Sequence, residues 1–327
     1  MDTNAIRAQS EAAYNQWCVQ WREHAKINSQ YEMKPLSDLE NTGVGKAILC
    51  VANGYSFEEN IETIKKYQHN VDILACDKTM GNLIDHGIIP KYVMVCDANV
   101  NYEKYMKPWK DKLQDTILLS NVCGSVDWPA NGNWKEKYFF INQDILESEK
   151  EFSAISGCKN FIVAGTNVSN AMVVMLTQCD NSRPANFFGY DKILLIGYDY
   201  SWRFGKKYYS FDENGGNKAN YMRHQYIKTA SGEFAYTSNN LAFSAQWFET
   251  YVKTFNLPVI QCTPHSVLTL KTGDLAEQMQ YKYKPEDAEN YRKTLASLKQ
   301  VESIRHILTQ QLNTIKKDHF RSFLSSV

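Results

Sequence analysis

The 327-residue sequence lacks a net charge and a metal-binding cysteine pattern. Lysine and arginine together number 36, as do aspartate and glutamate, so no strong field draws the chain to nucleic acid or to an anionic membrane. The eight cysteines include no CxxC pair. Several of them lie in apolar runs, which is typical of buried free thiols in a reducing compartment.

Long apolar segments are also missing. No run approaches the length needed to cross a membrane, and the first residues lack the apolar core of a signal peptide. There is no internal repeat and no low-complexity segment. We therefore expect a soluble, cytoplasmic protein with no membrane partner, built as one large domain with additions or as two smaller domains. Aromatic residues make up 13% of the chain, which suits a large core as well as a pocket lined by rings.

The stretch that organises the sequence begins with the apolar run Ala47–Val51 and turns at Asn53-Gly54. Ser56 and Glu59 have the spacing of a capping box, which predicts a helix that begins there. A helix N-terminus directly after a strand offers N–H groups and a positive dipole end, and phosphate is its usual ligand. An ordinary strand–turn–helix unit would explain the same pattern.

From residue 47 to about 200, strand-like and helix-like segments alternate. Most of the strand-like runs are apolar on both faces, which is typical of a parallel sheet covered by helices. Helices are expected at Lys78–His86, closed by Gly87, and at Asn167–Gln178. The pattern predicts an α/β fold with a Rossmann-like, doubly wound, mostly parallel sheet. Its expected strands are Ala47–Val51, Val71–Ala75, Tyr92–Cys96, Thr116–Leu119, Phe139–Ile141, Asn160–Ala164 and Ile193–Ile196.

Polar residues follow five of these strands, at the point where each strand ends. Singly, each is explained as a helix cap or a turn residue. Because the carboxyl ends of parallel strands meet at one edge of a sheet, we expect the five groups to form a site together. They are Asn53, Asp77, Asp97, Gly165-Thr166-Asn167 and Gly197-Tyr198-Asp199.

Three parts are expected: an N-terminal helical segment at 1–45, a Rossmann-like nucleotide-sugar-binding catalytic domain at 46–275, and a C-terminal helical tail at 276–327. The aromatic stripe of the first segment favours packing over ligand binding. The tail has an amphipathic stripe over Pro285–Leu324, which could dock on the domain or join two copies into a homo-oligomer. The stripe of the first segment consists of Tyr14, Trp17, Cys18 and Trp21.

The region after residue 200 begins with a long polar loop, Trp202–Asn220, that carries aromatic side chains. Such a loop beside a site indicates a lid or an acceptor-binding loop, although a plain excursion explains it equally well. A helix is then expected at Leu241–Phe255 and a late strand at Val259–Cys262.

Five motifs, in this order and spacing, resemble the motility-associated-factor glycosyltransferases, which place nonulosonic sugars on flagellin. The same segment, about 46–275, resembles the 6-hydroxymethylpterin diphosphokinase (MptE-like) family and, more distantly, bacterial sialyltransferases with a single Rossmann-like domain. The motifs are Val51-Ala-Asn-Gly-Tyr-Ser56, Ala75-Cys-Asp-Lys-Thr79 with Asn82-Leu-Ile-Asp-His-Gly-Ile-Ile-Pro90, Val95-Cys-Asp97, Ala164-Gly-Thr-Asn-Val-Ser-Asn-Ala171 and Ile196-Gly-Tyr-Asp-Tyr-Ser-Trp202.

The resemblance implies roles for individual residues. It places Asn53, Gly54 and Ser56 at the turn beneath the nucleotide phosphates, and Asp77 and Asp97 near the sugar nucleotide. The remaining binding residues that it implies are Gly165, Thr166 and Asn167 on the ribose or carboxylate side, Asp199 and Tyr200 against the base and ribose, and Tyr208 or Tyr209 on the donor phosphate.

The sequence departs from the sialyltransferase pattern where those enzymes carry a catalytic histidine. Thr237 stands at that position, and threonine cannot serve as a general base near neutral pH. The candidate catalytic residues are therefore Asp77, Asp97 and His224, with His265 a lesser candidate at another strand end.

The expected function is transfer of a sugar from a nucleotide-sugar donor, of CMP-nonulosonate or UDP-sugar type, to a protein, glycan or other acceptor. Asp77 and Asp97 could hold Mg²⁺ or Mn²⁺, since Mg²⁺ takes one or two carboxylates plus substrate oxygens. That same pair suits a competing function, that of a magnesium-dependent pterin-type diphosphokinase. A sugar transferase acting on modified DNA and a non-catalytic nucleotide-binding protein are also compatible with the sequence.

Overall fold

The computed structural model describes residues 3–142, 146–163, 165, 167–178, 187–202 and 225–280. The chain divides into two units, Met1–Tyr283 and Lys284–Val327, and all described residues belong to the first. The expected loop beyond Trp202 and the expected tail helix at Pro285–Leu324 lie outside the described residues. So do Thr166, Tyr208, Tyr209 and His224.

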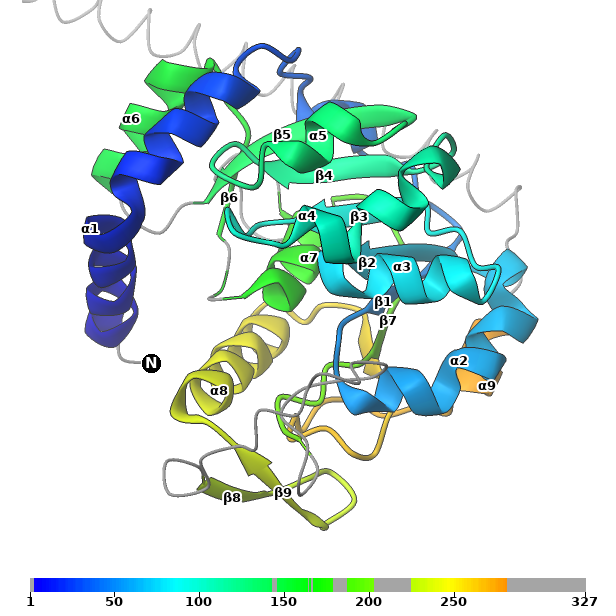
Figure 1. The fold of residues 1–327 in the computed structure, drawn as a ribbon. Coiled ribbons are helices and arrows are strands. Elements are labelled where there is room, and N and C mark those ends of the chain that lie inside the picture. Colours follow the sequence, from blue (N-terminus) through cyan, green and yellow to red (C-terminus); the bar gives the residue numbers. More distant parts are fainter. Residues whose placement is uncertain are drawn as a thin grey trace, which may run out of the picture. The chain divides into compact units, whose positions relative to one another are not determined.

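A parallel sheet forms the centre of the described part of the chain (Figure 1). Its eight strands have the order β10-β7-β1-β2-β3-β4-β5-β6, and every neighbouring pair is parallel. The order reverses at β1, which lies between β2 and β7, so β1 is the switch point of a doubly wound sheet. The strands are β1 (Ala47–Val51), β2 (Asp72–Cys76), β3 (Tyr92–Val95), β4 (Ile117–Asn121), β5 (Glu136–Asn142), β6 (Phe161–Ile162), β7 (Lys192–Ile196) and β10 (Val259–Gln261).

Helices cover both faces of this sheet, which confirms the predicted α/β fold. Successive residues of β1 point to opposite faces: Ile48 and Cys50 pack with α7 (Val168–Thr177) and α8 (Asn239–Thr254). Leu49 and Val51 pack with the helices on the other face. Those helices are α2 (Tyr55–Tyr67), α3 (Asp77–Asp85), α5 (Asp127–Asn131) and α9 (Leu275–Met279).

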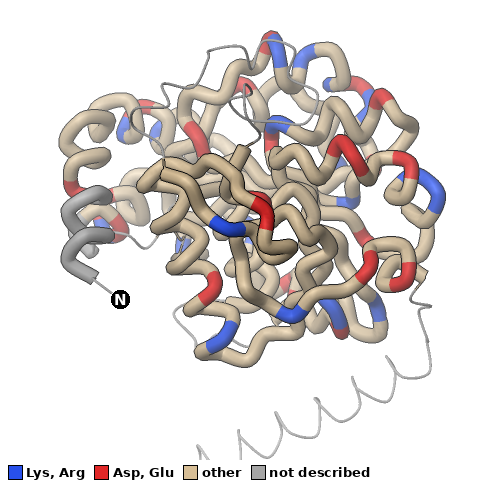
Figure 2. The backbone as a smooth tube through the Cα atoms, turned by 90° about the horizontal axis from the view of Figure 1, so that it is seen from below, with Lys and Arg blue, Asp and Glu red and all other residues tan. Residues whose placement is uncertain are grey.

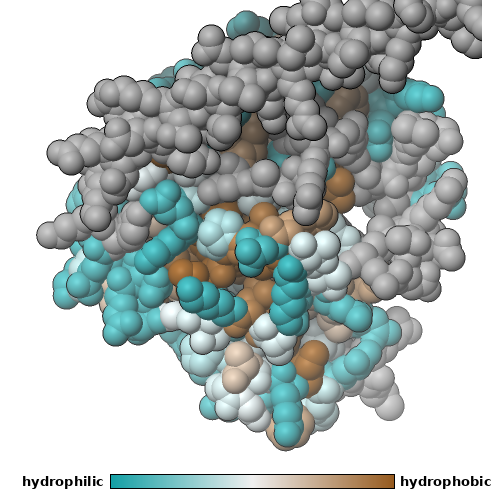
Figure 3. Space-filling model, turned by 180° about the vertical axis from the view of Figure 1, so that it is seen from behind, coloured by the Kyte–Doolittle hydropathy of each residue, from teal (hydrophilic) through white to brown (hydrophobic). Residues whose placement is uncertain are grey.

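Shorter helical pieces complete the connections, and Gly87 ends α3 as predicted, with a φ of +77°. The pieces are α4 (Tyr102–Tyr105), η1 (Leu36–Leu39), η2 (Gln68–Asn70) and η3 (Lys107–Lys112). No described helix has the length and apolar character needed to span a membrane. Figure 3 shows the molecule from behind. In its described part, apolar side chains lie together and polar side chains surround them.

The N-terminal helix α1 (Thr3–Asn28) is shorter than the predicted helical segment 1–45. It ends where the buried Asn28 amide donates to the Val122 carbonyl at 3.0 Å, and Pro35, which fits poorly inside a helix, follows. Tyr14 and Trp21 of the predicted stripe contact Phe152 of α6 (Leu146–Ser156) edge to face. The packing interpretation is therefore confirmed for those two side chains, but it is wrong for Trp17, which is 40% exposed.

A two-stranded antiparallel hairpin, β8 (Gln225–Lys228) and β9 (Phe234–Thr237), was not predicted. It is attached to the end of the β7 segment in two ways. Trp202 forms an antiparallel bridge with Tyr236, and the Thr237 hydroxyl donates to the Tyr200 carbonyl at 2.7 Å. The hairpin therefore lies at the carboxyl end of β7 (Figure 1).

The ends of β1 and β7 are joined by backbone hydrogen bonds that continue past the strands. Ala52 N–H donates to the Ile196 carbonyl and Gly54 N–H to the Gly197 carbonyl, both at 2.9 Å. Gly197 has a φ of +73°, and a Cβ there would lie 1.9 Å from the Ala52 carbonyl oxygen. Only glycine satisfies both the backbone angle and the close approach.

This contact predicts unequal costs for two glycine-to-alanine substitutions. In Gly87→Ala the new Cβ meets no atom within 4 Å. This substitution should lower the free energy of unfolding by about 1–2 kcal/mol, because alanine is strained in the left-handed backbone conformation. Gly197→Ala adds a backbone clash and should lose about 2 kcal/mol more. Urea unfolding at equal m-values measures the two free energies of unfolding. Equal decreases for the two variants would contradict the proposed close contact between Gly197 and the Ala52 carbonyl.

Candidate functional site

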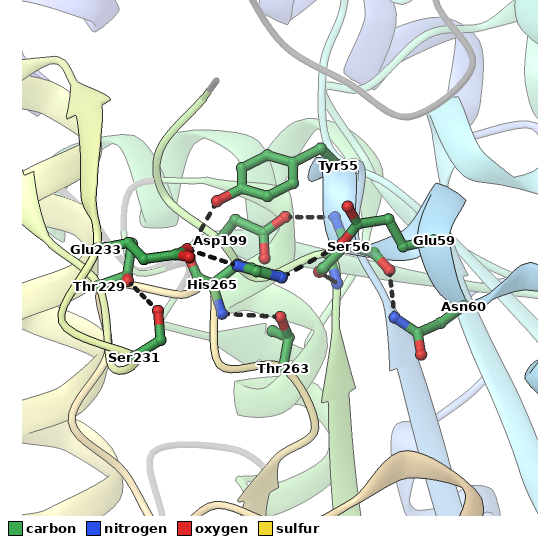
Figure 4. A network of polar contacts seen from close by, with 11 residues as sticks. Tyr55, Ser56, Glu59, Asn60, Asp199, Thr229, Ser231, Glu233, Thr263 and His265 are labelled. Atoms are coloured by element: carbon green, nitrogen blue, oxygen red, sulfur yellow. Dashed lines mark hydrogen bonds and ion pairs between the residues drawn. The ribbon is translucent and has the colours of Figure 1, made fainter. Parts of the chain in front are cut away.

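The N-terminus of α2 is capped by the chain that follows β7, and the predicted capping box is wrong. The helix begins at Tyr55, with Gly54 in the N-cap position. Asp199 accepts from the Ser56 N–H through Oδ2 at 2.9 Å, and the Ser56 hydroxyl accepts from the Gly197 N–H at 2.9 Å. Because a carboxylate from another segment takes the helix N–H, the serine hydroxyl is used to join β7 to α2 (Figure 4).

Asp199 is fully buried, and one of its two carboxylate oxygens has no hydrogen-bond partner among the described residues. Burial raises the pKa of this carboxyl to about 6, although the bonds from Ser56 and the nearby His265 act in the opposite direction. The unpartnered oxygen, Oδ1, accepts a hydrogen bond from any hydroxyl or amine that reaches it.

Gly54 is required by the protein's own packing. A Cβ at this position would lie 2.3 Å from Asp199 Oδ2 and 2.5 Å from the Gly197 carbonyl oxygen. A bulky substitution would therefore disturb the joint between β1 and β7 before any ligand is considered. The predicted phosphate role of Asn53 and Gly54 stays a prediction, and a phosphate there would have to share the helix end with a carboxyl group.

His265 lies beside this joint, in the loop that follows β10 (Figure 4). Its Nδ1 is 3.3 Å from Glu233 Oε2 and its Nε2 is 3.6 Å from Glu59 Oε2. The Tyr55 hydroxyl donates to the His265 carbonyl at 3.1 Å. The sequence placed His265 at a strand end but gave no signal for these partners, which come from α2 and from the turn between β8 and β9.

A second polar group lies at the ends of β2 and β3. Asp77 is the first residue of α3, is 3% exposed, and accepts from the Lys78 N–H at 2.7 Å. Burial raises the pKa of Asp77 to about 6, with a smaller contribution from the charge of Asp97, while Lys78 acts to lower it. Asp97 is exposed and accepts from the Asn99 N–H at 2.8 Å.

The divalent ion predicted at Asp77 and Asp97 stays a prediction. The charge of Asp97 contributes to the raised pKa of Asp77, and Mg²⁺ in proteins often takes one or two carboxylates together with substrate oxygens. Within the described ranges no group of three or more histidine, cysteine or acidic side chains could hold an ion by itself. A metal at Asp77 and Asp97 would therefore depend on the substrate.

Asn167 caps α7, accepting from the Asn170 N–H at 2.9 Å and from the Ser169 hydroxyl at 2.7 Å. Gly165 has a φ of +63°, and a Cβ there would collide with the ring of Trp247. Both residues thus have structural roles at the carboxyl end of β6. Their predicted roles in ligand binding remain predictions.

Tyr200 and Thr237 hold the hairpin on the sheet. Tyr200 has a φ of +50°, is buried, and donates from its hydroxyl to the Asn170 side chain. Thr237 is buried, with its hydroxyl bonded to the Tyr200 carbonyl. The residue that replaces the expected histidine is therefore an anchor of the hairpin and stays out of contact with solvent.

The charges around these elements are mixed. Seen from below, lysine and arginine alternate with aspartate and glutamate, and neither sign forms a continuous area on the described backbone (Figure 2). This agrees with the balanced composition. The described part of the chain therefore presents no broad field of one sign in this view.

The parallel order, the helices on both faces and the polar carboxyl ends define a Rossmann-like α/β protein. The profile of the family described as 6-hydroxymethylpterin diphosphokinase MptE-like matches residues 21–205. That range is more than half of the chain, so the chain belongs to the MptE-like family.

One similar solved structure is that of the MAf glycosyltransferase from Magnetospirillum magneticum AMB-1. It superposes with a TM-score of 0.58 at 15% sequence identity, and the match covers 85% of this chain and 42% of that protein. The chain thus spans less than half the length of this relative, and the likeness is one of fold. No match was found among curated proteins. The predicted resemblance to both groups is confirmed at the level of family and fold.

The buried carboxyl of Asp199 predicts a particular pH dependence of stability. The unfolded side chain loses its proton near pH 3.8, whereas the folded one keeps it to about pH 6. The free energy of unfolding should therefore fall as the pH rises through this window, by up to about 3 kcal/mol for this group. Asp77 contributes in the same direction.

Asp199→Asn should make the fall in stability between these pH values shallower. Asp115→Asn, which removes an exposed carboxylate, controls for the loss of one surface charge. Denaturant unfolding at several pH values gives the slopes. A slope for Asp199→Asn equal to that of the wild type would mean that the carboxyl is ionised in the folded protein throughout.

Proposed function

We propose that the chain is a glycosyltransferase that uses a nucleotide-sugar donor. The observation that carries the proposal is the gathering of Asp199, His265 and the α2 N-terminus at the switch point of the sheet. Ligands of doubly wound folds bind at this place. The fold likeness to the MAf glycosyltransferase over 85% of the chain supports the choice of reaction.

The arrangement at Asp199 suggests the orientation of the donor. A phosphate is disfavoured beside the Asp199 carboxylate, because both are anionic and the carboxylate already accepts the Ser56 N–H. A ribose hydroxyl or a base amine that reached the unpartnered Asp199 Oδ1 could instead donate a hydrogen bond to it. We therefore place the nucleoside against Asp199 and Tyr200 and the phosphates on the Asn53 side of the turn, because Gly54 itself packs against the Asp199 carboxylate. Tyr208 or Tyr209 would steady the phosphate, and Gly165, Thr166 and Asn167 would contact the sugar side.

Asp77 and Asp97 are proposed to hold Mg²⁺ or Mn²⁺ together with donor oxygens. The ion would supply charge to stabilise the departing phosphate. The acceptor is a protein, a glycan or modified DNA, and the mixed surface charge gives no support to tight duplex binding. A cytoplasmic location and a homo-oligomer formed by the terminal helices stay predictions.

A second candidate, a magnesium-dependent pterin-type diphosphokinase, is favoured by the description of the matching family. The paired carboxylates Asp77 and Asp97 suit it as well, because Mg²⁺ with a triphosphate needs few protein ligands. A nucleotide-binding protein without catalysis would share the same fold.

A ligand screen separates these candidates. We expect thermal unfolding to shift upward with a CMP- or UDP-linked sugar, because a ligand at about 100 times its dissociation constant adds about 2.7 kcal/mol of stability. ATP and GTP with Mg²⁺ and 6-hydroxymethylpterin form the competing arm. A thermal shift seen only with ATP or GTP and the pterin, together with transfer of diphosphate, would contradict the glycosyltransferase proposal. Binding without turnover in either arm would favour a non-catalytic nucleotide-binding protein.

The metal is tested separately. Donor turnover should vanish with excess EDTA and return with Mg²⁺ or Mn²⁺, and Asp97→Asn should require more metal for half-maximal rate. Asp111→Asn, on the exposed surface of η3, is the matched control. Full turnover in EDTA would leave a metal-free transferase and remove the metal role of Asp77 and Asp97.

A further inference from the structure

His265 is the described histidine that contacts the switch point of the sheet. His69 and His86 lie at the far ends of α2 and α3, and His24 on α1 is bonded to the Gly124 carbonyl. The side chain of His265 is 29% exposed, so a substrate can reach it. Two residues further on, the Val267 N–H donates to the Asp199 carbonyl at 3.2 Å, which holds this loop against the Asp199 segment.

The loop that carries His265 is held from several sides. His265 N–H donates to the Thr263 hydroxyl at 3.1 Å, and the Ser266 hydroxyl donates to the Tyr198 carbonyl at 2.7 Å. The Tyr55 hydroxyl bonds the His265 carbonyl, and the Tyr55 ring lies 5.9 Å from the imidazole centroid. The imidazole is therefore supported by elements from β7, β10 and α2, as a preorganised catalytic group requires.

The two ring nitrogens have unequal surroundings. Nδ1 lies 3.3 Å from Glu233 Oε2, whereas Nε2 lies 3.6 Å from Glu59 Oε2, which is beyond hydrogen-bond distance. A carboxylate beside Nδ1 favours the tautomer with its hydrogen there. Nε2 then carries the lone pair, with Glu59 Oε2 at 3.6 Å from it. A histidine with one ring nitrogen beside an acid is the usual form of an oriented histidine base.

We propose that His265 is the proton acceptor of the transfer, with Glu233 as its positioning residue; this assignment rests on the proposed glycosyltransferase function. The acceptor hydroxyl oxygen forms a bond to the anomeric carbon of the sugar. The bond from that carbon to the donor phosphate oxygen breaks, and its electron pair stays on the phosphate. The hydroxyl proton passes to His265 Nε2. This assignment gives the reaction a base although Thr237 is buried and bonded to the Tyr200 carbonyl.

The test uses the full chain, with CMP-N-acetylneuraminate and UDP-N-acetylglucosamine as probe donors and water as acceptor. Released nucleotide measures turnover, and calorimetry with CMP and UDP measures nucleotide affinity. His265→Gln should lower kcat by about 10²–10⁴-fold, the usual contribution of a general base, with nucleotide affinity and thermal unfolding unchanged. Imidazole in the buffer should restore turnover to His265→Ala. His69→Gln, at an exposed site in η2, is the control.

Glu233→Gln adds a test of positioning: it should lower kcat while leaving KM and nucleotide affinity unchanged. If His265→Gln keeps the wild-type kcat, the base assignment is wrong and the glycosyltransferase proposal stands. If kcat and nucleotide affinity fall together and imidazole restores nothing, His265 binds the donor, and the assignment is again wrong. If the wild type cleaves neither donor, the proposed function fails for these donors and the assignment fails with it.

Discussion

The hydrogen bonds between Asp199, Ser56 and Gly197 are the interaction on which the site depends. They are reciprocal: the helix N–H at Ser56 donates to the carboxylate, and the serine hydroxyl accepts from the Gly197 N–H. Segments 143 residues apart in sequence are thereby fixed at the switch point between β1 and β7. The loop with His265 builds on the same segment, because Val267 N–H donates to the Asp199 carbonyl at 3.2 Å.

The sheet could be predicted because burial on both faces leaves a clear mark on the sequence. Every residue of Ala47–Val51 is buried, and a run of this kind indicates a covered parallel strand without knowledge of its partners. The first strand of the hairpin has no such pattern in the sequence. Gln225–Lys228 is mostly exposed and does not alternate between apolar and polar residues. The length of α1 was overestimated because the prediction gave too little weight to Pro35, which fits poorly inside a helix.

The meeting of the polar strand ends at one edge of the sheet was predictable, but the contacts of the residues there were much less so. Topology alone brings Asp77, Asp97 and Asp199 to one edge, because parallel strands end together. The choice of cap at α2 was decided by a distant carboxylate, so the local pattern of Ser56 and Glu59 was misleading. Short-range sequence rules compare neighbours in the chain, and they hold no information about a partner supplied by another strand.

The buried carboxyl of Asp199 also constrains the chemistry of any ligand. A helix N-terminus normally attracts an anion, yet this one is already satisfied by a protein carboxylate whose second oxygen has no described partner. Leaving that buried oxygen without a hydrogen bond costs free energy, which a ligand hydroxyl or amine that reached it would recover. An anionic phosphate at the same place would instead add repulsion. On the proposed function, a ligand end that reaches Asp199 would therefore be one that donates hydrogen bonds, and the phosphate-bearing end would lie away from this carboxyl.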